Sequence, residues 1–160
     1  MDFNYYINNE TTTINNFFNQ TPNIKLNKII NEGYSPYDAV ITSGTTNGNI
    51  YGIVEAKKRT ISSTLYSEGV LLELNKLQRV QTELNKGKNN PNNVNKVLKS
   101  FYLVEYSDVT FLFDLQNVKL GNIINKKFPN YTAKTTDNKH IYKDVFFLNP
   151  KEAIITIPTK

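Results

Sequence analysis

A carboxylate and an ammonium group stand two residues apart at the end of an apolar segment, in Glu55-Ala56-Lys57. Side chains alternate along a strand, so Glu55 and Lys57 would share one of its faces. A buried charge is costly unless it is paired or bound to a metal ion, and both side chains therefore need partners. Asp38 is the nearest candidate, because a hairpin would bring Asp38 and Glu55 within reach of one ion.

Two carboxylates and the carbonyl of Ala56 are hard oxygen ligands, which Mg²⁺ prefers while it keeps several waters. A Mg²⁺ ion held there would lower the pKa of a bound water and neutralise charge that develops on a phosphate. Lys57 adds a cation that could orient or deprotonate the attacking water, or stabilise the pentavalent phosphate. The set predicts phosphodiester hydrolysis, with Mg²⁺ as the cofactor and Mn²⁺ able to replace it.

Two neighbouring strands must position these residues. The sequence predicts strands at about 37–42 and 50–58, joined by a turn of about seven residues in which Asn47-Gly48 is typical of a hairpin. Helices are predicted at about 4–19, in NIKLNKIINEG up to Gly33, and at about 67–87, where apolar residues follow a helical stripe.

The second half of the chain is richer in strand patterns. A second hairpin is predicted across SFYLVEY and VTFLFDL, followed by a short helix near 117–126 and by two strands around Asn149-Pro150. The stretch GKNNPNNVNK between the long helix and this hairpin is expected to be a polar linker. The whole order predicts one α/β domain over residues 1–160, with a mixed central sheet flanked by helices.

Pro36-x-Asp38 followed by Glu55-Ala56-Lys57 resembles the motif of the PD-(D/E)XK nucleases, the restriction-endonuclease-like superfamily. The proline stands two residues before Asp38 rather than next to it. The segment EAKKR…YSEGVLLELNKL is similar to small phage-type members. The resemblance covers about residues 4–115 and implies a restriction-endonuclease-like fold with an αβββαβ core, which leaves the C-terminal strands as additions. It also implies that Asp38 and Glu55 bind the metal and that Lys57 is catalytic.

The same resemblance implies two further contributions from helices. Many members place a Glu on the first helix, which Glu10 matches here. Many also add a polar residue from the helix after the E-x-K strand, for which Lys76 is the candidate and Glu73, Gln78 and Glu68 are rivals.

The formal net charge of +5 is typical of a protein that binds nucleic acid. Basic residues that follow the E-x-K motif are predicted to contact a phosphate backbone: Lys58, Arg59, Arg79, Lys86 and Lys88, next to Lys76. A solvated helix face with pairs such as Glu73–Lys76 would explain the helical members of this set equally well.

Two functions from different classes fit these observations. The first is a Mg²⁺-dependent nuclease, with DNA as the expected substrate. The second is a catalytically inactive nuclease-like domain that binds nucleic acid or a protein partner. A cross-strand ion pair of Glu55 and Lys57, worth under about 1 kcal/mol, is the purely structural alternative. The sequence does not distinguish DNA from RNA as the substrate, or an endonuclease from an exonuclease. A symmetric homodimer would suit cleavage of both strands or of a junction.

Other catalytic classes are excluded by composition. The chain has no Cys and a single His, His140, which excludes His-based metal triads, His-Asn-His nucleases and an acyl-transfer triad. His140 is expected on the surface. Asp137-Asn138-Lys139 also fits D-x-K, but no apolar strand precedes it. The aromatic residues of the later strands are expected in the core rather than stacked on bases.

No apolar run approaches the ~20 residues that span a bilayer, and the first residues lack the pattern of a signal peptide. We therefore expect a cytoplasmic protein without a membrane partner. Abundant Asn, and Lys in place of Arg, indicate AT-rich codon usage, as in a low-GC bacterium or its phage.

Overall fold

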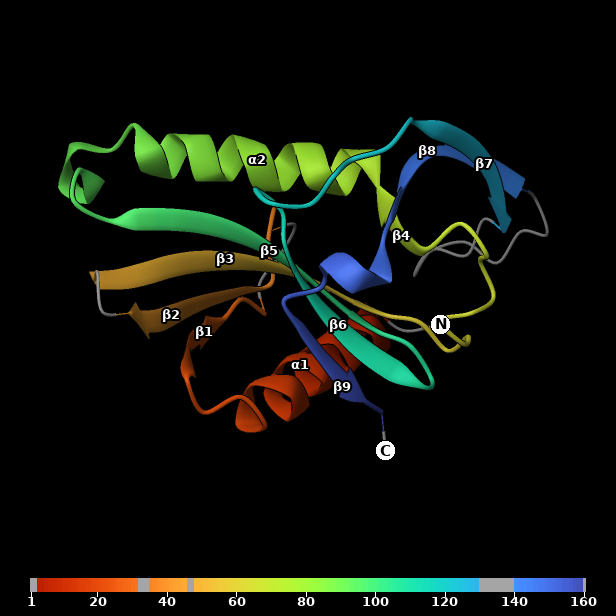
Figure 1. Ribbon diagram of the computed structural model, residues 1–160, viewed down its shortest axis with the longest axis horizontal. Coiled ribbons are helices and arrows are strands. Elements are labelled where there is room, and N and C mark those ends of the chain that lie inside the picture. Colours follow the sequence, from red (N-terminus) through yellow and green to blue (C-terminus); the bar gives the residue numbers. More distant parts are fainter. Residues whose placement is uncertain (1–2, 32–34, 46–47, 130–139, 160) are drawn as a thin grey trace.

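Two β-sheets and two α-helices make up the part of the chain that the computed structural model describes, residues 3–31, 35–45, 48–129 and 140–159 (Figure 1). In chain order, the elements are α1 (Phe3–Asn19), β1 (Ile24–Ile29), β2 (Ala39–Thr45), β3 (Gly48–Lys58), β4 (Val70–Glu73), α2 (Leu74–Lys88), the 3₁₀ turn η1 (Pro91–Asn93), β5 (Val97–Glu105), β6 (Val109–Asp114), β7 (Ile124–Pro129), β8 (His140–Leu148), η2 (Pro150–Glu152) and β9 (Ile155–Pro158).

The larger sheet is mixed and curled, with the strand order β1-β2-β3-β5-β6-β9. Its central pair β3–β5 is parallel, and the other neighbours are antiparallel. A parallel pair needs a crossover connection, which α2 provides. Helix α2 covers one face of the sheet and α1 covers the other (Figure 1). The smaller sheet, β4-β8-β7, lies at the N-terminal end of α2.

The two helices create two hydrophobic clusters, one on each face of the larger sheet. Residues spaced three and four apart on α2 face one cluster, with Leu77 and Val80 buried. On α1, Ile14 and Phe17 are buried in the other cluster, together with Val54 of β3. Alternation along β3 then directs residues 53, 55 and 57 to the α2 side and residues 54 and 56 to the α1 side.

At Gly52 of β3, side chains of the neighbouring strands β5 and β2 occupy the space that a Cβ atom would need. A Cβ atom at Gly52 would lie 2.5 Å from Cε2 of the buried Phe101 and 2.9 Å from Cγ1 of Ile41. We expect Gly52→Ala to destabilise the fold by about 1–3 kcal/mol, the usual effect of overpacking, as measured by urea unfolding. Gly44→Ala is the matched control on β2, since its Cβ would meet only Asn49 Oδ1, at 3.8 Å. Equal stability of the two variants would contradict this packing.

Several sequence predictions are confirmed. Helix α1 matches the predicted 4–19, and β2 and β3 match the predicted hairpin, although their pairing continues to Thr45 and Gly48, which makes the turn shorter than expected. Asn47 lies outside the described residues. The hairpin β5–β6 and the two strands around Asn149-Pro150 are also present. His140 is exposed, and most aromatic residues of the later strands are buried, as expected.

Three predictions of secondary structure are wrong. The segment NIKLNKI forms β1 instead of a helix, because pairing with β2 places Ile24, Leu26 and Ile29 against the α1 cluster. The predicted helix at 67–87 begins only at Leu74, since residues 70–73 pair with β8. A short apolar run fits either a buried strand or a helix. No helix forms at 117–126, where β7 begins at Ile124.

The described chain is therefore a mixed α/β structure with the order α1, β1, β2, β3, β4, α2, β5, in which β1 stands where the sequence pattern predicted a second helix. Neither of its α-helices has the length and hydrophobicity to cross a lipid bilayer. The segment Asp137-Asn138-Lys139 lies outside the described residues.

Candidate functional site

The register of the β2–β3 hairpin places Asp38 opposite Glu55. Ala39, the first residue of β2, pairs with Val54 of β3. Asp38, which precedes Ala39, therefore faces Glu55, which follows Val54. The N–H of Asp38 donates to the Val54 carbonyl at 2.8 Å. Its carboxylate oxygen Oδ2 accepts the N–H of Ala56 at 2.7 Å. The main chain of β3 thus holds Asp38 at two points, on either side of Glu55.

Strand β3 continues past the start of β2, and we call its residues 55–58 the β3 extension. Both the Val54 carbonyl and the Ala56 N–H point toward Asp38. The N–H and C=O of one residue in a strand point the same way, so the Ala56 carbonyl is also directed toward the Asp38 side. The extension therefore presents a main-chain oxygen beside two carboxylates.

Glu55 is almost completely buried, with 4% of its surface exposed. Its Oε1 lies 2.6 Å from the Nζ of Lys76, which α2 supplies. Burial raises the pKa of Glu55 to about 7; the charge of Asp38 adds to this rise, and Lys76 opposes it. Near neutral pH this carboxyl group is therefore close to its titration midpoint, and small changes in local charge alter its ionisation.

Lys57 and Glu10 meet at the β3 extension. The Lys57 Nζ lies 3.6 Å from Glu10 Oε1, and a third of the Lys57 side chain (33%) is exposed. Burial raises the pKa of Glu10 although Lys57 acts to lower it, and the charge of Asp38 raises it further. Lys57 is thus a partly accessible ammonium group at the border of the site, whereas Lys76 is held against Glu55.

The charges of three carboxylates act on Lys76. Burial acts to lower the pKa of this lysine, but Glu55, Asp38 and Glu10 outweigh it, and the pKa is raised. The pKa of Asp38 is also raised by burial, against the effects of the Ala56 N–H and of Lys76. The structure therefore brings together the five side chains that the sequence nominated for catalysis.

Arg79 lies one helical turn beyond Lys76 and tethers the segment before Asp38. Its Nη2 donates to the Ser35 carbonyl at 3.1 Å, and its charge acts to lower the pKa of Asp38. This contact connects α2 to the chain that leads into β2. The sequence did not predict the contact between Arg79 and Ser35, because these residues are far apart in the chain and belong to no motif.

The rivals of Lys76 lie elsewhere. Glu73 pairs with Lys143 of β8 at 3.1 Å, and Glu68 pairs with Lys126 of β7 at 3.6 Å. Gln78 is exposed on α2. Among the four candidates of this segment, only Lys76 contacts the site.

Four of the five residues predicted to face a phosphate backbone, Lys58, Arg59, Arg79 and Lys86, have partners inside the protein. Lys58 pairs with Glu105 of β5 at 3.1 Å, and Thr13 of α1 donates to the same carboxylate at 2.5 Å. The Arg59 Nη2 donates to the Leu71 carbonyl at 3.4 Å. The other three lie on α2: Arg79 and Lys88 are exposed, and Lys86 pairs with Glu83 at 2.6 Å.

The converging oxygen atoms suit a hard cation. Within the part of the chain that the structure describes, no group of three or more His, Asp or Glu side chains could hold a metal ion. The donors at the site are instead the carboxylates of Asp38 and Glu55, with the main chain of Ala56 between them. Mg²⁺ is commonly bound by one or two carboxylates plus waters and substrate phosphates, so this set fits Mg²⁺ by its chemistry.

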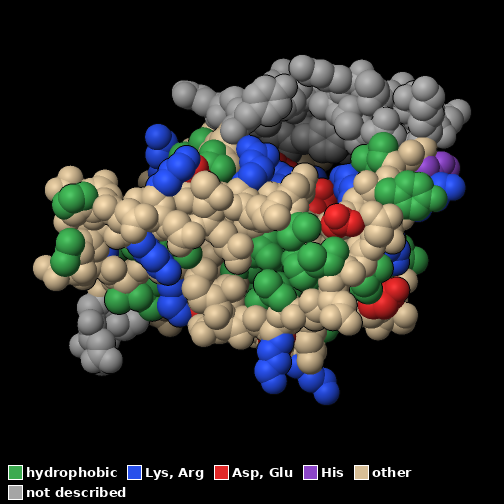
Figure 2. All heavy atoms as spheres, turned by 90° about the horizontal axis from the view of Figure 1, so that it is seen from above, with side chains coloured by type: hydrophobic (Ala, Val, Ile, Leu, Met, Phe, Trp, Pro, Cys, Tyr) green, Lys and Arg blue, Asp and Glu red, His purple; other side chains and the backbone are tan. Residues whose placement is uncertain are grey.

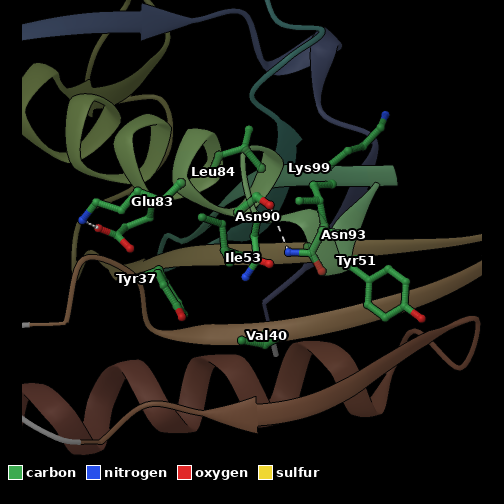
Figure 3. A pocket seen from close by; sticks show the side chains of 13 residues that line it. Tyr37, Val40, Tyr51, Ile53, Glu83, Leu84, Asn90, Asn93 and Lys99 are labelled. Carbon is green, nitrogen blue, oxygen red and sulfur yellow. Dashed lines mark hydrogen bonds and ion pairs between the residues drawn. The ribbon is translucent and has the colours of Figure 1, made fainter. Parts of the chain in front are cut away.

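Sequence reasoning missed a pocket beside this site. It has a volume of about 380 Å³ and lies between α2, η1 and strands β2 and β3 (Figure 3). Tyr37, Tyr51, Ile53, Asn90 and Asn93 are among its lining residues. The available signal was alternation, because residues 51 and 53 share the face of β3 that carries Glu55.

Comparisons with models of protein families, with curated proteins and with solved structures give no match to this chain.

Proposed function

We propose that this protein is a Mg²⁺-dependent nuclease of the PD-(D/E)XK type, which hydrolyses phosphodiester bonds, in DNA as the first expectation. The observation that carries the proposal is the convergence of Asp38, Glu55, Lys57 and Lys76 at the β3 extension. The order α1, β1, β2, β3, α2, β5 supports a restriction-endonuclease-like core, because it is the order that the resemblance implies.

In this proposal, Asp38, Glu55 and the Ala56 carbonyl hold the metal ion. Bound there, Mg²⁺ would activate a water and offset the charge of the phosphate. The contact with the Ala56 N–H fixes the orientation of Asp38. Lys76 keeps the Glu55 carboxylate in place and favours its ionised form. Each of the two carboxylate ligands, Asp38 and Glu55, is thus oriented by a second group, as is usual in metal sites.

Lys57 is the catalytic cation of this proposal. Its partly exposed ammonium can donate to the water or to a phosphate oxygen, while Glu10 limits its mobility. Hydrolysis joins the water oxygen to phosphorus and breaks the bond from phosphorus to the leaving sugar oxygen. That oxygen takes up one proton, so that one water is consumed for each bond cleaved.

Basic side chains on α2 are the proposed contacts to the nucleic-acid backbone. Arg79 and Lys86 are seven residues apart, or about two turns, which places them along one side of the helix. Figure 2 looks down on the face that carries α2, where Lys and Arg side chains lie along its borders around a hydrophobic centre. Cations that neutralise phosphates provide affinity that decreases as salt increases.

The direct test is cleavage by the purified protein. We expect it to cut DNA when Mg²⁺ or Mn²⁺ is present and to stop when EDTA is added. Single-stranded, duplex and RNA substrates should be compared in the same assay. Salt-dependent binding without cleavage in either metal would contradict the nuclease and favour an inactive nuclease-like domain that only binds nucleic acid.

Metal binding can be measured without any substrate. We expect the wild-type protein to bind Mn²⁺ in calorimetric titrations and Asp38→Asn to bind it at least about tenfold more weakly, since the variant loses one anionic ligand. Asp144→Asn is the control, because Asp144 is an exposed aspartate of β8 that contacts Asn125. Equal Mn²⁺ affinity of Asp38→Asn and the wild type would refute this metal site.

A further inference from the structure

The pocket and the proposed metal site are parts of one surface. Tyr37, which lines the pocket, directly precedes Asp38, and Ile53 precedes Glu55 by two residues on the same face of β3. Two residues of a strand span about 7 Å, so the pocket begins about one nucleotide away from the carboxylates. Its volume of about 380 Å³ lies in the usual range of small-ligand sites.

The walls of the pocket suit a flat ring. Val40, Ile53 and Leu84 contribute apolar surface from β2, β3 and α2. In Figure 3, Tyr37 lies below Glu83 on one side of the pocket and Tyr51 lies on the other side. The Lys96 Nζ lies 5.2 Å from the centroid of the Tyr51 ring. Stacking between a nucleobase and an aromatic side chain contributes about 1–3 kcal/mol and tolerates any base, because every base has a π-face.

Two amide side chains supply polar groups next to these walls. Asn90 Oδ1 accepts the N–H of Asn92 at 3.0 Å, and Asn93 Nδ2 donates to the Gly87 carbonyl at 2.9 Å. Over the described residues, the other amide atoms, Asn90 Nδ2 and Asn93 Oδ1, have no protein partner. The Asn90 amide nitrogen can therefore donate to a ligand, and the Asn93 amide oxygen can accept from it. The edge of a nucleobase presents complementary groups.

The charges of the pocket argue against a phosphate as its occupant. Lys86 is paired with Glu83 at 2.6 Å, and Lys99 is paired with Asp114 at 2.5 Å. Lys99 is thus paired at the wall of the pocket, whereas Lys86, whose side chain is 67% exposed, pairs with Glu83 at the surface and is directed to solvent, where it can meet the nucleic-acid backbone outside the pocket. A neutral ring suits this environment better than an anion, while the phosphate next to it would meet Lys57 at the β3 extension.

We propose that this pocket binds one unpaired nucleobase next to the phosphate that the Asp38–Glu55 site receives. The inference rests on the proposed function and specifies its substrate class. The strand to be cut carries an unpaired nucleotide beside the scissile bond, as in a single strand, an overhang or a flap. An intact duplex keeps that base stacked and paired, and extruding it costs a few kcal/mol.

The test measures binding in EDTA, so that it does not depend on cleavage. Fluorescence anisotropy would compare a blunt DNA hairpin with the same hairpin carrying a short 5′ or 3′ overhang. We expect one overhang to bind about tenfold more tightly than the blunt form, consistent with one stacked base. A single abasic nucleotide can then be placed at each position of the overhang in turn. We expect the higher affinity to be lost when it stands at one particular position and kept when it stands at the others.

Two variants act on the pocket in different ways. Tyr37→Ala removes an aromatic wall but keeps the main-chain contacts of Tyr37 with Ser35. Val40→Phe fills the pocket from a partly buried position of β2, where an aromatic residue suits a strand. Both are expected to lose the preference for the overhang. Tyr142→Ala is the control, because this tyrosine of β8 is 66% exposed and does not line the pocket.

The outcomes separate the two proposals. Position-specific binding that Val40→Phe abolishes supports the base pocket even if the protein cuts no DNA. Equal affinity of the wild type for blunt and overhanging hairpins overturns the pocket. The pocket is also overturned if the abasic nucleotide lowers affinity equally at every position, or if its effect is unchanged in both variants. In that case, metal-dependent cleavage of the blunt duplex would support the nuclease without the pocket.

Discussion

Glu55→Gln is expected to lower the rate of metal-dependent DNA cleavage by about a thousandfold. The substitution keeps the volume of the side chain but removes the negative charge that would bind the metal, and the loss of one well-placed electrostatic group at an active site costs about this much. The change should affect the cleavage rate far more than DNA affinity, because Glu55 is 4% exposed and offers no surface to the nucleic acid. Single-turnover rates and anisotropy in EDTA would separate the two quantities.

A matched variant controls for the loss of a glutamate beside α2. Glu73→Gln removes a carboxylate that pairs with Lys143 at 3.1 Å, directly before the helix and outside the site. It should cleave at close to the wild-type rate. If Glu55→Gln were to retain more than about a tenth of the wild-type rate, Glu55 would not be a metal ligand in the reaction.

The stability of the metal-free protein is expected to decrease between about pH 4.5 and pH 7. The pKa of Glu55 rises from 4.5 to about 7 on folding, so the folded state holds this proton more tightly than the unfolded state. The resulting stabilisation is complete below pH 4.5 and is lost as the pH rises through the folded-state pKa. At about 1.4 kcal/mol for each pKa unit, the loss amounts to about 3 kcal/mol.

Urea unfolding at pH 5 and pH 8 in EDTA would measure this change. Glu55→Gln carries no titrating proton at this position, so it should flatten the pH dependence and be more stable than the wild type at pH 8. Lys76→Met should steepen the dependence, because Lys76 acts to lower the pKa of Glu55. A wild-type protein that becomes more stable from pH 5 to pH 8 would be inconsistent with a buried Glu55 whose pKa is raised on folding.

The candidate site was largely predictable because its main parts are local in sequence. Asp38 and Glu55 belong to one hairpin, and strand alternation together with the hairpin fixes which side chains face each other. The sequence left the register of this hairpin open. In the structure, Ala39 pairs with Val54, and the strands extend further than expected toward Thr45 and Gly48, so the predicted turn was too long. Lys76 was placed by the resemblance, and its contact with Glu55 follows from the crossover of α2 over the sheet.

The errors lie where distant segments decide the structure. Nothing within residues 70–73 distinguishes the start of a helix from a strand, and only the pairing with β8 makes this segment β4. Lys58 and Arg59 looked like surface cations, but β3 remains paired with β5 as far as Lys58 and Glu105. The Lys58 side chain therefore pairs with Glu105 of β5, and the Arg59 side chain contacts the Leu71 carbonyl of β4, rather than solvent alone. The pocket likewise depends on distant segments, because α2, η1, β3 and β5 all contribute lining residues.

Because β4 pairs with β8, the candidate site depends on a strand near the C-terminal end of the described chain. Strand β4 runs directly into α2, and Lys76 follows it within the first turn of that helix. Val70 pairs with Leu148 and Glu73 with Val145, so the C-terminal region acts as an anchor for the helix that delivers Lys76. A truncation that removed β8 would leave the Asp38–Glu55 hairpin covalently intact but would release the lysine that completes it.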